Sequence, residues 1–238
     1  MANIALARLE TALAARKLDR TLTTALPPLE RQDASAFITT DVPALDACLR
    51  GGLPRGQLSE TVGPSSSGRT SLCLQTIAAV TRRGEIAALV DSFDRLDVAA
   101  AAAAGIDLER LLWIRGHEAR IAHALKALNL VLQAGGFGCV ALDIADIPLI
   151  ELKRIPFTTW LRVQRVIEGS DTACVLVAPQ PLARSAGGLT LMLTGRTRWS
   201  GDADRSRRLT GADLNIRVVS PRRRVDGEVG VRAVTDSH

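Results

Sequence analysis

Aromatic side chains are scarce in this sequence: they make up 3% of the residues, and tyrosine is absent. Surfaces that bind single-stranded nucleic acid by base stacking need exposed aromatic rings, so the composition argues against a binding surface built mainly on such rings. Histidine occurs only three times, and neither the histidines nor the acidic residues form the pattern of a metal site, a catalytic triad or paired catalytic carboxylates. We therefore expect no catalytic residues of these kinds and no bound metal.

The sequence also lacks the patterns of an exported or membrane-bound protein. Its four cysteines lie in apolar stretches and form no C-x-x-C pair, which favours buried reduced thiols over disulfides or zinc ligands. Arg8, Glu10 and Arg16 interrupt the N-terminal residues, and no apolar run approaches the roughly 20 residues that span a bilayer. We therefore expect a cytoplasmic protein without a membrane segment.

Lysine is rare, so the net charge of +5 comes from arginine. This balance fits contact with nucleic acid or an acidic protein, and it fits a solvated surface rich in arginine equally well. As a surface for DNA or a protein partner we consider two arginine clusters and the neighbouring tryptophan: Arg184, Arg196, Arg198, Trp199, Arg205, Arg207, Arg208, Arg222, Arg223 and Arg224. Trp199 is expected to be exposed, as a partner anchor would be, whereas Trp160 is expected in the core.

The chain divides into two regions of different pattern. Residues 4–20 place leucines along one side, which predicts an amphipathic helix, and residues 21–36 contain Pro27-Pro28, which is typical of a linker. We therefore predict an N-terminal helix and linker over 1–36 and a core domain over 37–238. The helix can pack on its own core or dock on a partner, and both possibilities stay open.

Strands and helices alternate through most of the core. The pattern predicts strands at 57–62, 85–91, 111–115, 137–143 and 172–178, of which 85–91 is a short apolar run, and helices at 69–83, 98–104, 117–134 and 148–168. Such alternation is typical of an α/β fold with a mainly parallel sheet and helices on both faces. Further strands at 189–198, 213–219 and 228–234, with Asp226-Gly227 as a hairpin signal between the last two, predict antiparallel strands at the C-terminal end.

A nearly complete phosphate-binding loop follows the first of these strands. The segment Gly63-Pro-Ser-Ser-Ser-Gly68-Arg69-Thr70 matches G-x-x-x-x-G-K-[ST] at every fixed position except that Arg69 replaces lysine. In such loops, backbone N–H groups and a helix N-terminus surround a phosphate, and the Thr hydroxyl binds magnesium. The candidate nucleotide-binding residues are Gly63, Ser65, Ser66, Ser67, Gly68, Arg69, Thr70, Ser71 and Asp143. Because arginine is a larger planar group than lysine, a loop that keeps only its shape and binds no nucleotide is an equal alternative.

The order of these motifs resembles the core of RecA. Ile38–Asp46 leads into Gly51–Gly56, the phosphate loop and Leu74–Ala79, and the resemblance is strongest over 38–143 within 37–224. It implies a RecA-like P-loop fold, in which Asp143 takes the place of the magnesium-binding acid. It also places Gln180 where RecA has its nucleotide-sensing glutamine.

Several positions depart from the RecA pattern. The resemblance places Phe93 where RecA has its general-base glutamate, with Asp94 one position away, and Ala100 where a tyrosine stacks near adenine. The two segments that hold the DNA-binding loops of RecA, before Gln180 and between Gln180 and Gly187, are shorter here. We therefore expect weak or absent ATP binding, no hydrolysis, no ATP-dependent filament, and only weak, sequence-independent binding of DNA.

This combination of features is more similar to ImuA proteins, which are degenerate RecA-like partners of mutagenic translesion polymerases. The segments Pro179–Gly188 and Leu189–Trp199 carry this resemblance. It implies a non-enzymatic role in the SOS response and translesion synthesis, with RecA and an ImuB-type Y-family polymerase homologue as partners, and ATP with magnesium as a doubtful cofactor. A weak DNA-dependent ATPase or recombinase paralogue and a SulA-like inhibitor of cell division are the alternatives.

Overall fold

The computed structural model describes residues 34–116, 121–183, 187–201, 207–219 and 227–234. The amphipathic helix predicted at 4–20 and nearly all of the linker predicted at 21–36 lie outside these residues. The segment Ala34–His238 forms one compact unit. Within its described residues, no helix is long and apolar enough to cross a bilayer.

An eight-stranded sheet forms the centre of this unit, with the strand order β10-β9-β8-β3-β7-β6-β4-β5. The strands from β8 to β5 are parallel to their neighbours, whereas β8, β9 and β10 pair antiparallel. The parallel strands are β3 (Leu58–Val62), β4 (Ala87–Asp91), β5 (Leu111–Arg115), β6 (Cys139–Asp143) and β7 (Ala173–Ala178). Apolar residues dominate β4, β6 and β7 because helices cover both faces of this part of the sheet, whereas β3 also buries the polar residues Ser59, Glu60 and Thr61. The predicted fold class is confirmed.

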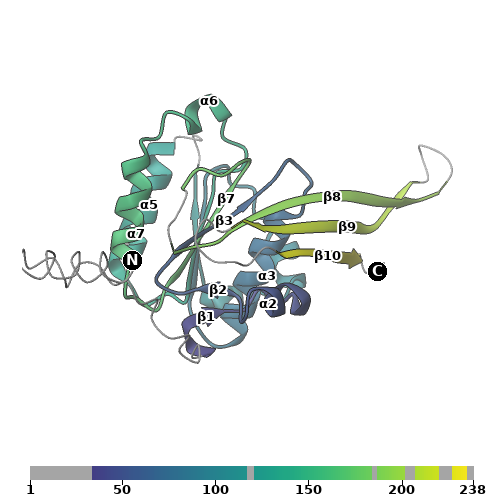
Figure 1. The fold of residues 1–238 in the computed structure, drawn as a ribbon, viewed down its shortest axis with the longest axis horizontal. Helices are drawn as coiled ribbons and strands as arrows, with labels where there is room; N and C mark the ends of the chain where they lie inside the picture. The colour runs from purple at the N-terminus through teal and green to yellow at the C-terminus, as the bar shows by residue number, and fades with distance from the viewer. Residues whose placement is uncertain (1–33, 117–120, 184–186, 202–206, 220–226, 235–238) are drawn as a thin grey trace, which may run out of the picture. The chain divides into compact units, whose positions relative to one another are not determined.

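Helices lie on both sides of the sheet (Figure 1). On one side are α2 (Pro43–Cys48), α3 (Arg69–Arg82) and α4 (Val98–Ala103). On the other are α5 (Ile121–Ala134), α6 (Leu149–Leu152) and α7 (Phe157–Ile167). Each set packs its own apolar cluster against one face of the sheet. A small ladder of β1 (Phe37–Ile38) with β2 (Leu53–Pro54) and two 3-10 turns, Ala34–Ala36 and Leu108–Arg110, complete the domain.

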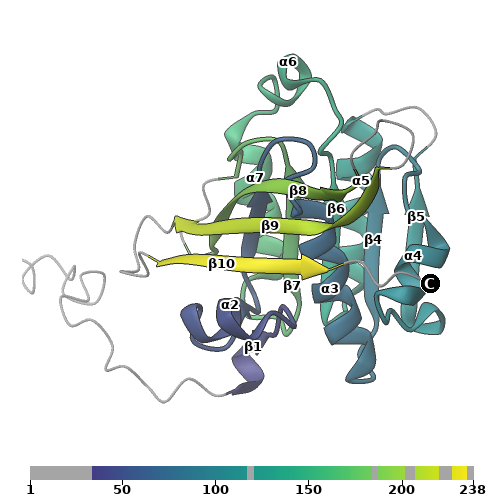
Figure 2. The ribbon, with the colours of Figure 1, turned by 90° about the vertical axis from the view of Figure 1, so that its right-hand side faces the viewer.

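The single helix predicted at 148–168 is wrong, since the structure has two helices, α6 and α7, separated at Pro156. Pro156 is extended, with ψ of 138°, and precedes the first residue of α7. A proline has no N–H to continue a helix, and it forces the residue before it away from helical geometry. The break lets α6 stand beyond the carboxyl ends of the parallel strands (Figures 1 and 2).

The C-terminal strands are β8 (Thr190–Ser200), β9 (Arg208–Val219) and β10 (Gly227–Val234). β8 and β9 continue past the rest of the sheet as a two-stranded ribbon (Figure 1), and β9 begins five residues earlier than predicted. The antiparallel pairing of β9 with β10 is confirmed, but Asp226-Gly227 is not a two-residue turn between them. Gly227 already pairs with Val218, so a longer segment connects the two strands.

Candidate functional site

The phosphate-binding loop lies where the sequence places it, between β3 and α3. Gly68 adopts a left-handed conformation with φ of +86°, directly before the first residue of α3. A Cβ atom at Gly68 would lie 2.7 Å from the side chain of Leu214 in β9, and one at Gly63 would lie 2.3 Å from the carbonyl oxygen of Leu193 in β8. Packing against β8 and β9 therefore explains both glycines, independently of any phosphate.

The side chain of Arg69 turns back into the loop. It is buried, with 6% of its surface exposed. One guanidinium nitrogen, Nη1, donates to the carbonyl oxygen of Gly63, and the other, Nη2, lies 3.4 Å from the carbonyl oxygen of Ala145. Nη2 is also 3.9 Å from a carboxylate oxygen of Asp146. Arg69 thus connects the start of the phosphate loop to the turn after β6.

The remaining loop residues differ in exposure. Ser65, Ser66, Thr70 and Ser71 are exposed, so the Thr70 hydroxyl is open to solvent. Ser67 is buried, and its Oγ has no hydrogen-bond partner among the described residues. The structure therefore brings the predicted loop residues together at the N-terminus of α3, with arginine in place of the lysine that would reach a phosphate.

Two aspartates lie side by side at the carboxyl ends of neighbouring strands. Asp91 ends β4 and Asp143 ends β6, and the two residues are directly paired in the sheet. Burial raises the pKa of Asp143 to about 6; the nearby Asp91 and Asp146 also raise it, whereas the backbone N–H of Ala145 and the charge of Arg69 lower it.

The carboxylate of Asp91 accepts hydrogen bonds from other groups of the protein. Its oxygens accept hydrogen bonds from the backbone N–H groups of Phe93, Arg95 and Leu96 and from the indole of Trp113. These bonds form the turn after β4. Asp91 was not among the residues predicted from the sequence, although it ends an apolar strand just as Asp143 does, and that position was the signal available.

The turn after β4 contains the position that the RecA resemblance assigns to the general base. Phe93 stands there and packs against the apolar cluster under α5 and α7. Asp94, one position on, makes two hydrogen bonds of 2.7 Å to the guanidinium of Arg115. Asp97 accepts the N–H groups of Ala99 and Ala100 and so caps α4. Each of these side chains has a structural partner within the domain.

Gln180 has different neighbours from these residues. It lines a hollow of about 390 Å³ together with side chains of α6, α7 and the segment after β7. Among the described residues, no group of three or more histidines, cysteines or acids could hold a metal ion.

The predicted DNA or partner surface falls mostly on the ribbon. Arg196, Arg198 and Trp199 belong to β8, and Arg207 and Arg208 lie at the start of β9; Arg184, Arg205 and Arg222, Arg223 and Arg224 lie outside the described residues. Trp199 is 51% exposed, as predicted, and Trp160 is buried. The Arg207 guanidinium lies 5.9 Å from the centre of the Trp199 ring.

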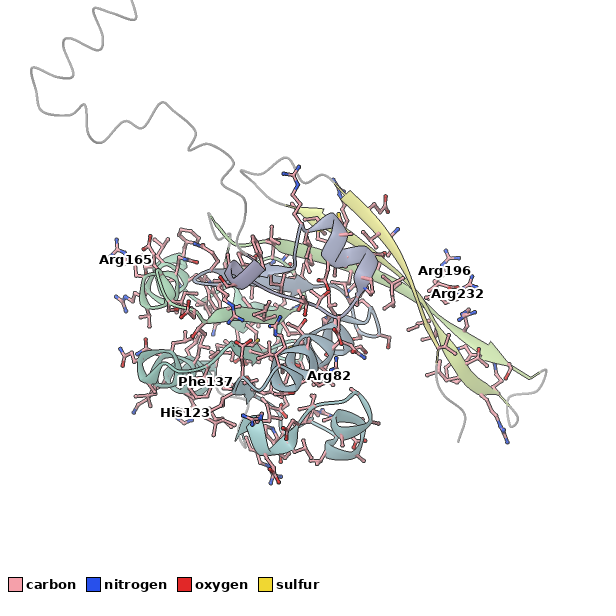
Figure 3. The ribbon with its side chains drawn as sticks, turned by 90° about the horizontal axis from the view of Figure 1, so that it is seen from below. Arg82, His123, Phe137, Arg165, Arg196 and Arg232 are labelled. Atoms are coloured by element: carbon pink, nitrogen blue, oxygen red, sulfur yellow. The ribbon has the colours of Figure 1, made fainter. Side chains whose placement is uncertain are left out.

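Part of the ribbon's positive charge is neutralised within the protein. Asp213 of β9 lies 3.5 Å from Arg198 and 3.3 Å from Arg232. Arg196 is paired with the same aspartate in the strand register, and Figure 3 shows Arg196 and Arg232 close together on the ribbon. The arrangement leaves an exposed strip with a modest excess of arginine.

A parallel sheet with a glycine-rich loop between β3 and α3 and aspartates at the ends of the neighbouring strands defines a P-loop domain of the RecA type. A sequence model of the RecA N-terminal domain matches residues 15–153. The chain therefore belongs to the RecA N-terminal domain family.

RecA proteins themselves are similar to part of the chain. RecA of Synechococcus sp. (strain WH7803) is 49% identical over 75 residues, which is 32% of this chain and 20% of that RecA. RecA of Prochlorococcus marinus (strain SARG) is 38% identical over 106 residues, or 44% of this chain and 27% of that RecA. RecA of Synechococcus elongatus is 36% identical over 118 residues, or 49% of this chain and 33% of that RecA. The chain thus spans at most about a third of the length of these relatives.

Proposed function

We propose that this protein is a non-catalytic, ImuA-type member of the family that acts in DNA repair, in the SOS response and translesion synthesis. In this role it bridges RecA and an ImuB-type Y-family polymerase homologue in the cytoplasm. The observation that carries the proposal is the position of Arg69, which donates to the carbonyl oxygens of Gly63 and Ala145. In this motif the side chain at this position contacts phosphate. Here it hydrogen-bonds to backbone carbonyl oxygens of its own domain instead.

The turn after β4 supports the same proposal. A phenylalanine cannot take a proton from water, and the nearby Asp94 is engaged by Arg115. Loss of a positioned general base forfeits a factor of roughly 10²–10⁴ in rate. The proposed role therefore does not use ATP with magnesium as a cofactor for turnover.

We prefer this role to two others. A weak DNA-dependent ATPase or recombinase paralogue would need a working base and loops that hold DNA, and the ribbon arginines support only weak, sequence-independent contact with phosphates. A SulA-like inhibitor of cell division would have no reason to keep a phosphate loop that matches all but one fixed position.

Binding of the purified full chain to RecA, and separately to an ImuB-type polymerase homologue, tests the adaptor role by titration calorimetry. We expect micromolar or tighter affinity for both. We also expect deletion of residues 1–24 to weaken binding to RecA, because that segment carries the predicted amphipathic helix. Circular dichroism of the deletion variant controls for folding. Absence of binding to either protein at micromolar concentration would contradict the adaptor role.

A further inference from the structure

One edge of β8 has no neighbouring strand where β8 enters the ribbon. β3 pairs with β8 only over Thr190–Met192, whereas β9 pairs with it as far as Ser200 (Figure 1). The phosphate loop lies beside Leu193 and Gly195, so among the described residues the open part of the edge is 196–200. The backbone N–H and C=O groups of such an edge can pair with an added strand.

The side chains along this open edge alternate between two faces of different chemistry. Arg196 and Arg198 lie on one face and Thr197 and Trp199 on the other, because successive side chains of a strand point to opposite sides. The indole N–H of Trp199 donates to the Thr197 hydroxyl at 3.0 Å, which agrees with a shared face. A strand added beside β8 would therefore meet guanidinium groups on one face and an indole ring on the other.

On the face of the arginines, charges alternate in sign from strand to strand. Arg232 of β10 is paired with Asp213 of β9, and Asp213 is paired in turn with Arg196 of β8. Asp213 lies 3.3 Å from Arg232 and 3.5 Å from Arg198, whereas Arg196 forms no ion pair within the described part of the chain. The row thus runs positive, negative, positive and ends on a cation at the open edge. A carboxylate would continue it, because opposite charges directly across strands stabilise a sheet.

On the other face, an apolar pair lies near the end of the ribbon. Trp199 is directly opposite Leu209 of β9, and the two residues are 51% and 43% exposed. A β-bulge lies beside this pair, and the Thr210 hydroxyl donates to the carbonyl oxygen of Arg198 there at 3.1 Å. An apolar side chain on an added strand would lie next to the indole and extend the pair to a row across three strands.

We propose that the open edge of β8 binds an extended segment of a partner protein in which acidic and apolar residues alternate. The segment adds a strand to the ribbon. Its acidic side chains lie opposite Arg196 and Arg198, and its apolar side chains lie beside Trp199. The proposal goes beyond the adaptor role and does not rest on it, because it concerns a sequence pattern recognised at one edge and names neither RecA nor a polymerase.

The same edge disfavours two other occupants. If β8 paired with a second copy of itself, Arg196 and Arg198 of one strand would lie near the same residues of the other, and like charges across strands destabilise pairing. Single-stranded DNA offers phosphates to the arginines, but it cannot continue the hydrogen bonds of a strand. Among the described residues of β8, β9 and β10, Trp199 is the only ring on which a base could stack. A peptide strand can satisfy the backbone, the cations and the indole together.

Selection of peptides from a random display library on the immobilised full chain tests the proposal. We expect the enriched peptides to alternate Asp or Glu with large apolar residues, and a synthetic copy of the most enriched one to bind with micromolar affinity in fluorescence anisotropy. A peptide of the same composition, with its acidic and apolar residues gathered into two blocks, should bind about tenfold more weakly, because its carboxylates no longer share one face. N-methylation of the peptide's backbone amides should abolish binding, because a methylated amide cannot donate to β8.

Substitutions in the protein test the two faces of the edge separately. Trp199→Thr should weaken binding of the enriched peptide about tenfold, while threonine keeps the strand propensity. Arg196→Glu should weaken it by a similar factor, and a peptide whose acidic residues are replaced by arginine should bind this variant better than it binds the original protein. Leu112→Thr is the matched control, because Leu112 is 43% exposed and lies in β5, the edge strand at the other end of the sheet. It should leave affinity unchanged, and circular dichroism establishes that each variant is folded.

The proposal is overturned if no peptide is enriched, if the enriched peptides lack the alternation, or if the reordered or N-methylated peptide binds equally well. Binding that neither Trp199→Thr nor Arg196→Glu weakens, or that Leu112→Thr abolishes, would overturn it by placing the peptide elsewhere. A dimer in sedimentation that Trp199→Thr dissociates, or binding of oligo-dT that Trp199→Thr abolishes, would name a second copy or DNA as the occupant instead. A negative result with RecA and the polymerase homologue, by contrast, leaves the peptide result intact, so the two proposals fail separately.

Discussion

At the residue scale, the proposal rests on Arg69, the one substitution in the phosphate-loop motif. A lysine side chain is a point charge on a flexible stem, whereas the guanidinium presents several donors in a plane. Here those donors reach carbonyl oxygens of Gly63 and Ala145, on two different segments. The loop keeps the shape of its family because protein groups take the place of phosphate oxygens as acceptors.

Arg69→Met should therefore destabilise the protein. The methionine fills similar space but removes the donors to the buried carbonyl oxygen of Gly63 and the partly buried one of Ala145, which costs roughly 1–3 kcal/mol. Urea denaturation monitored by circular dichroism measures the change. Arg154→Met is the control, because Arg154 is exposed and such surface changes usually stay within about 0.5 kcal/mol. If both variants were equally stable, the fastening role of Arg69 would be wrong.

Asp143 gives a prediction about pH. Burial raises its pKa to about 6 in the folded protein, from 3.8. The folded state therefore holds the proton more tightly than the unfolded state, and this residue reduces stability progressively as pH rises between those two values. The penalty at higher pH is at most about 3 kcal/mol.

Asp143→Asn removes that penalty, since the amide oxygen can still accept the N–H of Ala145. We expect the variant to be more stable than the original protein near pH 8, to keep about half of that advantage near pH 5, and to lose it only below the unfolded pKa of 3.8. Chemical denaturation at both pH values measures this. An equal change at both pH values, or a loss of stability near pH 8, would show that burial does not control this carboxyl group.

Among the elements, α4 depends on one capping residue. Its sequence, Val98 followed by five alanines, has good intrinsic helix propensity but little to bury, and among its described residues only Ala101 is buried. Asp97 accepts two of the N–H groups that the first turn leaves without partners, at 2.9 and 3.1 Å. The cap therefore matters more here than in a helix with a wide apolar face.

Asp97→Ala should cost about 1 kcal/mol and increase hydrogen exchange at the amides of Ala101 and Ala104. Asp97→Asn keeps a capping oxygen and should behave like the original protein. Exchange measured by NMR or mass spectrometry separates the two variants. If Asp97→Asn exchanged as fast as Asp97→Ala, the charge rather than the hydrogen bonds would account for the effect.

The elements also show what could be predicted from the sequence. The strands at 57–62, 111–115 and 172–178 were located to within a residue. For 172–178 the reason is that a strand buried on both faces is apolar throughout, whereas β3 contains three polar residues and β5 is a partly exposed strand at the edge of the sheet. The early start of β9 was missed because Arg208–Ala212, with arginine, threonine and glycine among its five residues, is not a continuous apolar run, and its pairing with β8 makes it a strand. The prediction of a turn at Asp226-Gly227 was wrong, because Gly227 already belongs to β10 and pairs with Val218.

The candidate site, too, could be predicted from the sequence only in part. The loop, Asp143 and the replacement at Phe93 follow from motif and resemblance. The hydrogen bonds of Arg69 could not be predicted in this way. They join the carbonyl oxygen of Gly63, after β3, to that of Ala145, after β6, and these two residues are 82 positions apart in the sequence. The hollow beside Gln180 likewise depends on segments that meet only in the folded chain.

At the scale of the whole molecule, the domain combines a RecA-type sheet with a ribbon of β8 and β9 at its C-terminal end. The ribbon carries arginines partly neutralised by Asp213. The proposed function treats the chain as a binding protein on this scaffold.

Electron microscopy of the full chain with ATP, magnesium and single-stranded DNA tests the assembly that this account excludes. We expect no regular helical filaments, because a filament switched by ATP requires turnover or tight binding at the phosphate loop. Any association with DNA should weaken steeply as salt rises, as binding through phosphate contacts does. Regular filaments along the DNA would contradict the account.

Steady-state ATP hydrolysis is the most direct test of the central claim, that the phosphate loop is structural. The full chain is assayed with and without single-stranded DNA beside Thr70→Ala, which removes the hydroxyl that would bind magnesium, with a RecA protein as the positive control. We predict phosphate release at background level for the full chain, equal to that of Thr70→Ala, under both conditions. Steady turnover by the full chain that Thr70→Ala abolishes would contradict this claim.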